Sequence, residues 1–137
     1  MNHIHTPMDR SELSALGVLN LAHVGDGVYE LLVRTHLARQ GACRLADQHR
    51  RTIAFVAAPA QAAALECLLP GLTEEERAVV RRGRNARVHG CPSGCTPAQY
   101  HAATALETLF GWLWLSGRPE RIEELFGQIL EETENAT

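Results

Sequence analysis

The sequence predicts an all-α fold, a single domain built as a bundle of closely crossing helices. Apolar residues recur at roughly 3.6-residue spacing through most of the chain, and Gly and Pro interrupt this pattern at about helix-length intervals. No convincing pair of strands and no internal repeat is visible. The 137 residues suit one domain over 1–137, whose termini, 1–10 and 133–137, we expect to be flexible.

The first half of the chain predicts three helices. An apolar stripe runs from Val18 to Leu37, and Gly41 suits the position just after the end of this first helix. The next two helices are expected over 46–57 and 59–69, and the second of these has a proline in its first turn. The three helices follow one another with short connections.

The second half predicts three more helices. The capping-box sequence TEEE at 73–76 opens a helix that runs through several arginines to about Arg87. Residues 88–96 form a loop rich in Gly and Pro. The remaining helices are expected over 97–115 and 119–132, the first of them capped by a threonine.

Composition excludes several classes of protein. With 45% apolar and 21% charged residues, the chain is too apolar to be disordered. Its longest apolar reach, 52–69, is interrupted by Pro59, Gln61 and Glu66, so we expect no membrane span. No basic-then-apolar leader opens the sequence, which predicts a cytoplasmic protein with reduced thiols at its four cysteines.

Two basic clusters stand out in a chain of net charge −3. Residues 77–89 hold five arginines and no acid, and residues 34–51 hold five with Asp47 as the one acid. Local field governs contact with phosphate, so nucleic-acid binding stays open beside the alternative of a solvated helix end. Gly83 leaves room for close backbone approach. The candidate phosphate contacts are Arg81, Arg82, Arg84, Asn85 and Arg87, with a weaker second patch at Arg50 and Arg51.

Two carboxylates lie in apolar helical segments. Asp26 stands between two glycines in NLAHVGDGVYELLV, and Glu107 lies in YHAATALETLFGWLWL. Glycine-Asp-glycine is ordinary turn chemistry, and a buried ion pair or partial exposure is the common fate of one such acid. Two of them on different helices could instead converge on a divalent cation.

Four motifs resemble the ribonuclease III endonucleases, in particular the Mini-ribonuclease III family. LAHVGDGVYELLVRTHLARQG is similar to the signature helix of the larger family. DQHRRT, RRGRNAR and TALETLFGWLWL resemble three elements of the small family, in the expected order. The resemblance covers roughly residues 13–132 and implies a ribonuclease III-like helical domain that forms a homodimer.

The resemblance also implies roles for individual residues, and the match of RRGRNAR favours RNA contact by its arginines over a solvated helix end. Asp26 and Glu107 match the metal-binding catalytic carboxylates of the family. Glu30 matches a further signature acid, but its spacing also suits an ion pair with Arg34, which we favour. Two acids of full-length ribonuclease III are replaced here by Ala22 and Thr104, as in the small family. Fewer protein ligands imply a water-rich metal site.

The implied function is metal-dependent cleavage of double-stranded RNA. Mg²⁺, with Mn²⁺ able to substitute, would activate water at Asp26 and Glu107 and leave 5′-phosphate and 3′-hydroxyl ends. Each subunit of the dimer would cut one strand, and the duplex would be read through its shape and backbone. The implied substrate is a precursor of large-subunit (23S) ribosomal RNA, and a large-subunit ribosomal protein is a conceivable partner. No separate double-stranded-RNA-binding domain is expected.

Two alternatives remain open from sequence. The first is a non-catalytic helical module that binds RNA or a protein, against which the presence of both carboxylates argues. The second is a zinc-containing interaction domain built on HGCPSGC, with His89, Cys91, Cys95 and His101 as ligands. That spacing fits no common zinc finger, so a flexible loop is the favoured interpretation, and the resemblance implies that the loop touches RNA.

Overall fold

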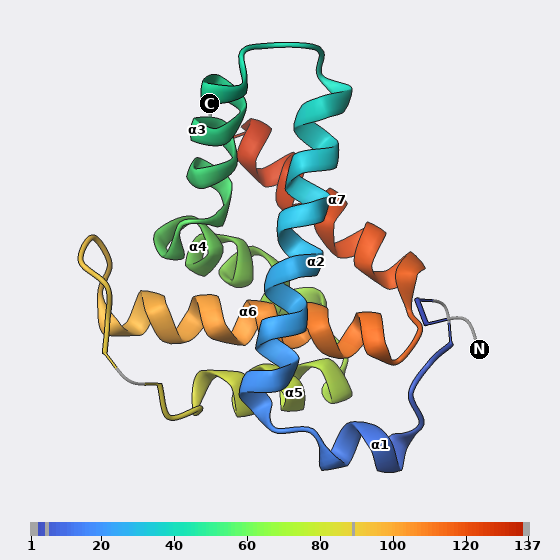
Figure 1. The fold of residues 1–137 in the computed structure, drawn as a ribbon. Coiled ribbons are helices and arrows are strands. Elements are labelled where there is room, and N and C mark those ends of the chain that lie inside the picture. The colour runs from blue at the N-terminus through green and yellow to red at the C-terminus, as the bar shows by residue number, and fades with distance from the viewer. Residues whose placement is uncertain (1–2, 5, 89, 136–137) are drawn as a thin grey trace.

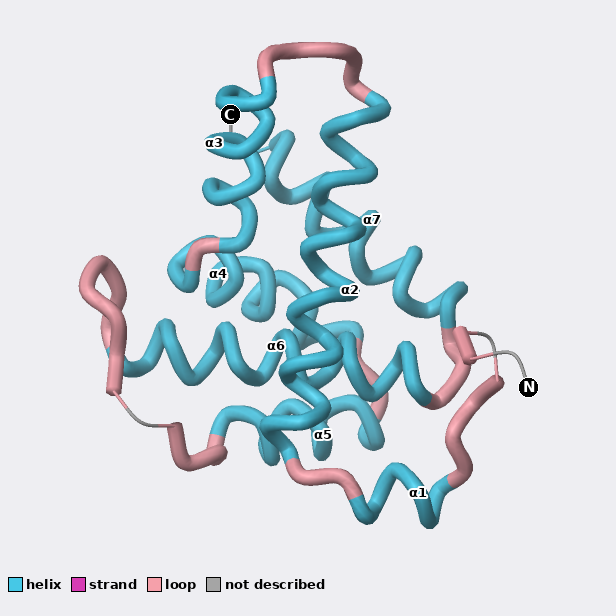
Figure 2. Tube along the Cα trace, in the orientation of Figure 1, coloured by secondary structure: helices cyan, strands magenta, loops and turns pink. Residues whose placement is uncertain are grey.

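A computed structural model describes residues 3–4, 6–88 and 90–135, and it is helical throughout (Figures 1 and 2). No strand occurs in this part of the chain, so the predicted all-α class is confirmed. The elements are α1 (Arg10–Ala15), α2 (Val18–Arg39), α3 (Leu45–Val56), α4 (Ala58–Leu68), the 3-10 turn η1 (Leu69–Gly71), α5 (Glu74–Arg84), α6 (Pro97–Leu115) and α7 (Pro119–Asn135).

The central element is α6, which the other helices surround. In Figure 1, α2 crosses in front of it, while α4 and α5 lie along opposite sides. Eleven residues of α6 are buried, including Leu106, Leu109 and Phe110, which are fully enclosed. The ring of Tyr29 from α2 meets Phe110 edge-on at 5.4 Å, a favourable aromatic geometry. The helix most buried in the core is thus the one that carries Glu107.

Glycines set the crossing of α2 and α6. A Cβ on Gly25 would collide with the backbone carbonyl of Glu107, and one on Gly111 would collide with that of Leu21. The two backbones therefore touch directly, which only glycine permits. Gly27 faces open space instead. The turn interpretation of the glycine-Asp-glycine segment is wrong: all three residues lie inside α2, where close helix packing outweighs the low helix propensity of glycine.

Gly83 makes a second close approach, between α5 and α6. A Cβ there would lie 2.7 Å from the Cα of Ala105 and 2.7 Å from the Thr108 hydroxyl. Gly83 is buried, and α6 packs against it. The close backbone approach expected at Gly83 is therefore made by α6 and not by RNA.

The helix boundaries differ from the predictions at three places. The short helix α1 was not predicted; Asp9 and Glu12 form its capping box. α5 ends at Arg84, three residues early, where Asn85 closes the helix. α7 continues to Asn135. No single helix among the described residues is long and apolar enough to span a membrane, although the bent pair 45–56 and 58–71 passes that test jointly.

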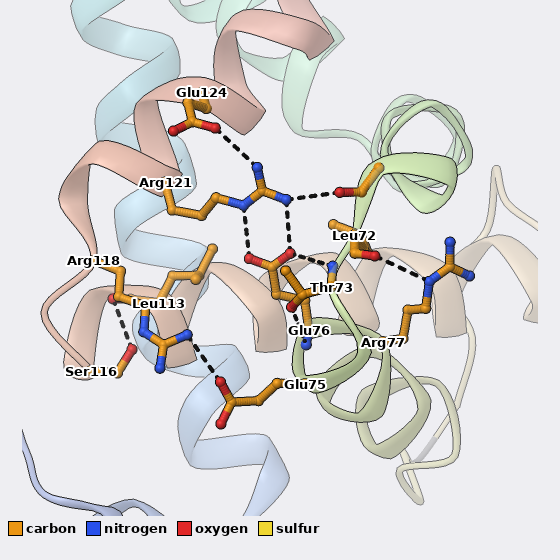
Figure 3. Close-up of polar contacts among 11 residues, drawn as sticks. Leu72, Thr73, Glu75, Glu76, Arg77, Leu113, Ser116, Arg118, Arg121 and Glu124 are labelled. Atoms are coloured by element: carbon orange, nitrogen blue, oxygen red, sulfur yellow. Dashed lines mark hydrogen bonds and ion pairs between the residues drawn. The ribbon is translucent and has the colours of Figure 1, made fainter.

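A buried ion pair ties α5 to α7 (Figure 3). Both oxygens of the Glu76 carboxylate accept from the Arg121 guanidinium, at 2.8 and 2.9 Å, and the side chain of Glu76 is 2% exposed. Burial alone would raise the pKa of Glu76, but hydrogen bonds from Arg121 and the Thr73 backbone N–H, with the charge of Arg121, outweigh it and lower that pKa. The predicted capping box of Thr73 and Glu76 is confirmed.

Replacing Glu76 with Gln should cost about 3 kcal/mol of unfolding free energy at pH 7, the low end of the range for breaking a buried ion pair, because the Arg121 side chain is 21% exposed. The pKa of Glu76 is lower in the folded chain than in the unfolded chain. The ionised carboxylate therefore stabilises the fold fully above pH 4.5, the ordinary pKa, and this stabilisation disappears as the pH falls through the lowered pKa of the folded chain. Urea unfolding at pH 7 and pH 3 measures this. The exposed neighbour Glu74, changed to Gln, is the control; an equal loss at both pH values would contradict the account.

Candidate active site

The crossing of α2 and α6 brings Asp26 and Glu107 together. The two carboxyl groups lie within hydrogen-bonding reach of each other when one of them carries a proton. Burial, followed by the hydrogen bond and the negative charge of Asp26, raises the pKa of Glu107 to about 8, while a hydrogen bond from Gln61 opposes this shift. Asp26 itself is exposed to solvent. Two acids that are about eighty residues apart in the sequence are thus neighbours in the fold. The repulsion between their negative charges favours binding of a cation or a proton between them.

Gln61 is a site residue that sequence reasoning missed. It lies on α4, is 2% exposed, and its side-chain amide donates to Glu107. The amide therefore gives the Glu107 carboxylate a hydrogen-bond donor from α4. The one available signal was a single amide side chain in the alanine-rich segment APAQAAALECL.

This donor set fits a magnesium-type cation. Carboxylate oxygens are the ligands such hard cations prefer, and Mg²⁺ is commonly held by one or two of them, with water and phosphate oxygens completing the shell. Within the described ranges no group of three or more His, Cys, Asp and Glu side chains converges. The chain thus offers Asp26 and Glu107 as the pair, and leaves room for water and a phosphate.

Glu107 and Gln61 line a surface depression. One wall is the loop from Pro92 to Cys95, and the other walls come from the α3–α4 corner and from Tyr100 on α6. The predicted loop over 88–96 therefore stands next to the carboxylate pair.

The arginines predicted to bind RNA divide into two groups. Arg81, Arg82, Asn85 and Arg87 line a shallow depression together with the first turn of α2. Arg84 points elsewhere and pairs with Glu66, at 3.6 Å. The N-terminus of α2 adds backbone N–H groups and the positive end of the helix dipole, so this depression suits an anion.

The second patch is partnered within the chain. Arg50 forms an ion pair with Asp47, and Arg51 donates to the Gln40 side chain at 3.1 Å. Both arginines remain exposed on α3, and neither lines the depression at Glu107. Glu30 pairs with Arg34 at 3.2 Å, the geometry of the favoured structural interpretation.

The zinc alternative finds no support in the described residues. His89 lies outside them, and no third ligand joins Cys91 and Cys95. The Nδ1 atom of His101 is buried on α6 without a hydrogen-bond partner.

Comparisons with known proteins show the family of the chain. Residues 19–118 match the family described as the Ribonuclease III domain. A Mini-ribonuclease 3 of Symbiobacterium thermophilum is 50% identical over 107 residues, 78% of this chain and 82% of the relative. One from Kosmotoga olearia is 42% identical over 98% of this chain and 86% of the relative. The crystal structure of a Fusobacterium nucleatum protein superposes with a TM-score of 0.80, at 26% identity over 88% of this chain and 97% of that one.

Proposed function

Because the chain belongs to the Mini-ribonuclease 3 branch of the ribonuclease III family, we propose that it is an endoribonuclease that cuts double-stranded RNA at Asp26 and Glu107. The observation that carries the proposal is the contact between these two carboxylates, and a separate arginine-lined depression at the start of α2 supports it. A non-catalytic RNA-binding module has no use for two acids that repel each other, and would gain stability by losing one.

The residues divide the chemical work. Asp26 and Glu107 would hold Mg²⁺ or Mn²⁺, and Gln61 would keep the Glu107 carboxylate in place. When bound, the cation supplies activation of water and neutralises charge on the phosphodiester. Arg81, Arg82 and Arg87 would bind backbone phosphates nearby. Hydrolysis of the P–O3′ bond would then leave 5′-phosphate and 3′-hydroxyl ends.

We expect the active form to be a homodimer that uses the exposed face of α2. Leu31 is 63% exposed, and it borders an apolar depression with Val28, Leu32 and Trp114. Exposed apolar surface of this kind marks interaction sites. A second copy would place two carboxylate pairs on one duplex, so each subunit could cut one strand. The proposed substrate is a base-paired stem in precursor 23S ribosomal RNA in the cytoplasm, with a large-subunit ribosomal protein as a candidate stimulator.

The test of function is cleavage of an end-labelled RNA duplex in Mg²⁺. We expect cutting of the duplex, and none with EDTA, with either single strand alone, or with a DNA duplex of the same sequence. The downstream products should be substrates for a 5′-phosphate-dependent exonuclease. Tight duplex binding without cutting, in Mg²⁺ and in Mn²⁺ across several stems, would establish the binding module instead.

Gln61→Leu should slow cleavage by at least about tenfold and raise the half-saturating Mg²⁺ concentration, because loss of a residue that orients a metal ligand typically costs 10–100-fold. The fold should persist, with a loss of about 1–3 kcal/mol of unfolding free energy, because a Glu107 oxygen loses its donor; circular dichroism and urea unfolding measure this. Gln128→Leu on the exposed side of α7 is the control. An unchanged Mg²⁺ dependence in Gln61→Leu would remove Gln61 from the site.

Arg82→Ala should weaken RNA binding equally for all sequences and make the dependence of log K on log salt about one unit shallower, the effect of one lost phosphate contact. Arg39→Ala, the same charge change at the far end of α2, should leave the slope unaltered. Filter binding between low and moderate salt measures both. Equal slopes for the wild type and Arg82→Ala would mean that Arg82 is a solvated surface residue that contacts no phosphate.

A further inference from the structure

A pair of thiols lies in the loop that forms one wall of the depression at Glu107, here called the catalytic depression; Cys95 lines the depression, and Cys91 is its neighbour in the loop. The Sγ atoms of Cys91 and Cys95 lie 3.6 Å apart, close to van der Waals contact. Both sulfurs also lie against backbone carbonyls of their own loop: Cys91 Sγ is 3.5 Å from the Cys95 oxygen, and Cys95 Sγ is 3.5 Å from the Pro92 oxygen. The five-residue segment is thus already folded back on itself, with its two sulfurs together.

The backbone of the loop supports this arrangement. Gly90 and Gly94 have φ values of +77° and +91°, which other residues rarely adopt, so glycines create the reversal that brings the thiols together. Cys95 is half-buried next to Thr96, the N-cap of α6, whereas Cys91 is exposed. One sulfur is therefore anchored to the helix that carries Glu107, and the other is accessible from solvent. Figure 1 shows the loop, in yellow, rising at the start of α6 beside α4.

We propose that Cys91 and Cys95 form a reversible disulfide that regulates the catalytic depression, with a low-molecular-weight disulfide as the oxidant. The exposed Cys91 attacks the oxidant RSSR as a thiolate, forms a mixed disulfide and releases RS⁻. The Cys95 thiolate then attacks the Cys91 sulfur and releases the second RS⁻. The protein dithiol loses two electrons and two protons, and one RSSR becomes two RSH.

The chemistry of each thiol matches its part in this sequence. Cys91 is exposed and Cys95 is half-buried, so a dissolved oxidant reaches Cys91 first; burial and the neighbouring Cys91 thiol also raise the pKa of Cys95. The second step is intramolecular between sulfurs already in contact, which makes it fast relative to a second attack from solution. Neither Cys43 nor Cys67 is paired with another cysteine.

Oxidation changes the wall next to Glu107. The sulfurs must move from 3.6 Å to a bond of about 2.05 Å, and the thiol hydrogens that face the Pro92 and Cys95 carbonyls are lost. The segment from Pro92 to Cys95 lines the same depression as Glu107 and Gln61. A covalent ring in this wall restrains its movement when a duplex is seated. This expectation rests on the proposed nuclease function: the oxidised form should cut several-fold more slowly than the reduced form.

The experiment equilibrates the folded protein in glutathione redox buffers, followed by acid quenching, mass analysis of the peptide that holds both cysteines, and a cleavage assay. We expect that peptide to lose two hydrogen atoms, and cleavage to fall several-fold and recover with dithiothreitol. Cys91→Ser should cut at one rate in every redox buffer, and Cys43→Ser should show the same redox response as the wild type. Circular dichroism confirms that both variants fold.

Distinct results would overturn the proposal. Glutathione adducts or free thiols in place of the internal disulfide would remove the disulfide site. A disulfide that leaves the cleavage rate unchanged would remove its regulatory role. If the reduced wild type cuts no duplex, the nuclease function and its regulation fail together, while the mass measurement still decides whether the disulfide forms.

Discussion

Asp26→Asn and Glu107→Gln should each lower the rate of duplex cleavage by more than about 100-fold while the helical fold stays intact. Losing a residue that only orients a metal ligand costs 10–100-fold, so losing a ligand itself should cost more. The two carboxylates contact each other and would act on one cation, so their effects should not add. The double variant is therefore expected to be little slower than either single variant.

The stability of the two variants distinguishes a catalytic role of Asp26 and Glu107 from a structural role. Removing one of two neighbouring carboxylates relieves repulsion and leaves no buried cation unpaired, so both variants should unfold at or above the wild-type temperature in EDTA. Thermal unfolding with and without Mg²⁺ measures this, and Mg²⁺ should stabilise only the wild type. Clear destabilisation of Glu107→Gln in EDTA would mean that Glu107 serves the fold.

Gly25→Ala should destabilise the protein by about 3 kcal/mol or more, at the upper end of the range for overpacking. The new methyl group would collide with the Glu107 carbonyl and lie 2.8 Å from the Gly111 nitrogen. Backbone atoms of a buried helix cannot turn away as a flexible side chain can, so α2 and α6 must separate. The separation would also draw Asp26 away from Glu107.

Gly127→Ala is the matched control for that substitution. Gly127 lies inside α7, and a Cβ there would meet no atom within 4 Å. Alanine is the better helix former, so this variant should gain about 0.5–1 kcal/mol. Urea unfolding of both variants gives the comparison. Similar stability of Gly25→Ala and the wild type would show that the two helices are not in direct backbone contact.

The helical architecture could be predicted because its signals are local. Apolar periodicity, the Thr73 capping box and the proline after Thr96 each act within a few residues, and each is found as predicted. The short helix α1 escaped because it buries no residue, so no apolar stripe marks it. The turn alternative at Asp26 failed for another reason: local chemistry favours a turn there, and only contact with the distant Gly111 explains a helix.

The site was predictable in part. Asp26 and Glu107 stand out as acids in apolar helices, so they could be named from the sequence, although their contact needed the fold. Gln61 was hidden because a buried amide on an alanine-rich helix has no sequence signature without its partner. The partner of Arg84 was equally invisible, because Glu66 lies on a different helix. Interactions between distant segments depend on the packing of whole helices, which periodicity alone does not determine.

The most direct measurement of the central claim is the initial cleavage rate of one labelled RNA duplex in Mg²⁺ by three proteins. These are the wild type, Glu107→Gln, and Glu131→Gln, which makes the same chemical change on the exposed side of α7. We predict equal cutting by the wild type and Glu131→Gln, and no cutting above the EDTA background by Glu107→Gln. Wild-type cutting by Glu107→Gln would contradict the assignment of the carboxylate pair as the catalytic centre.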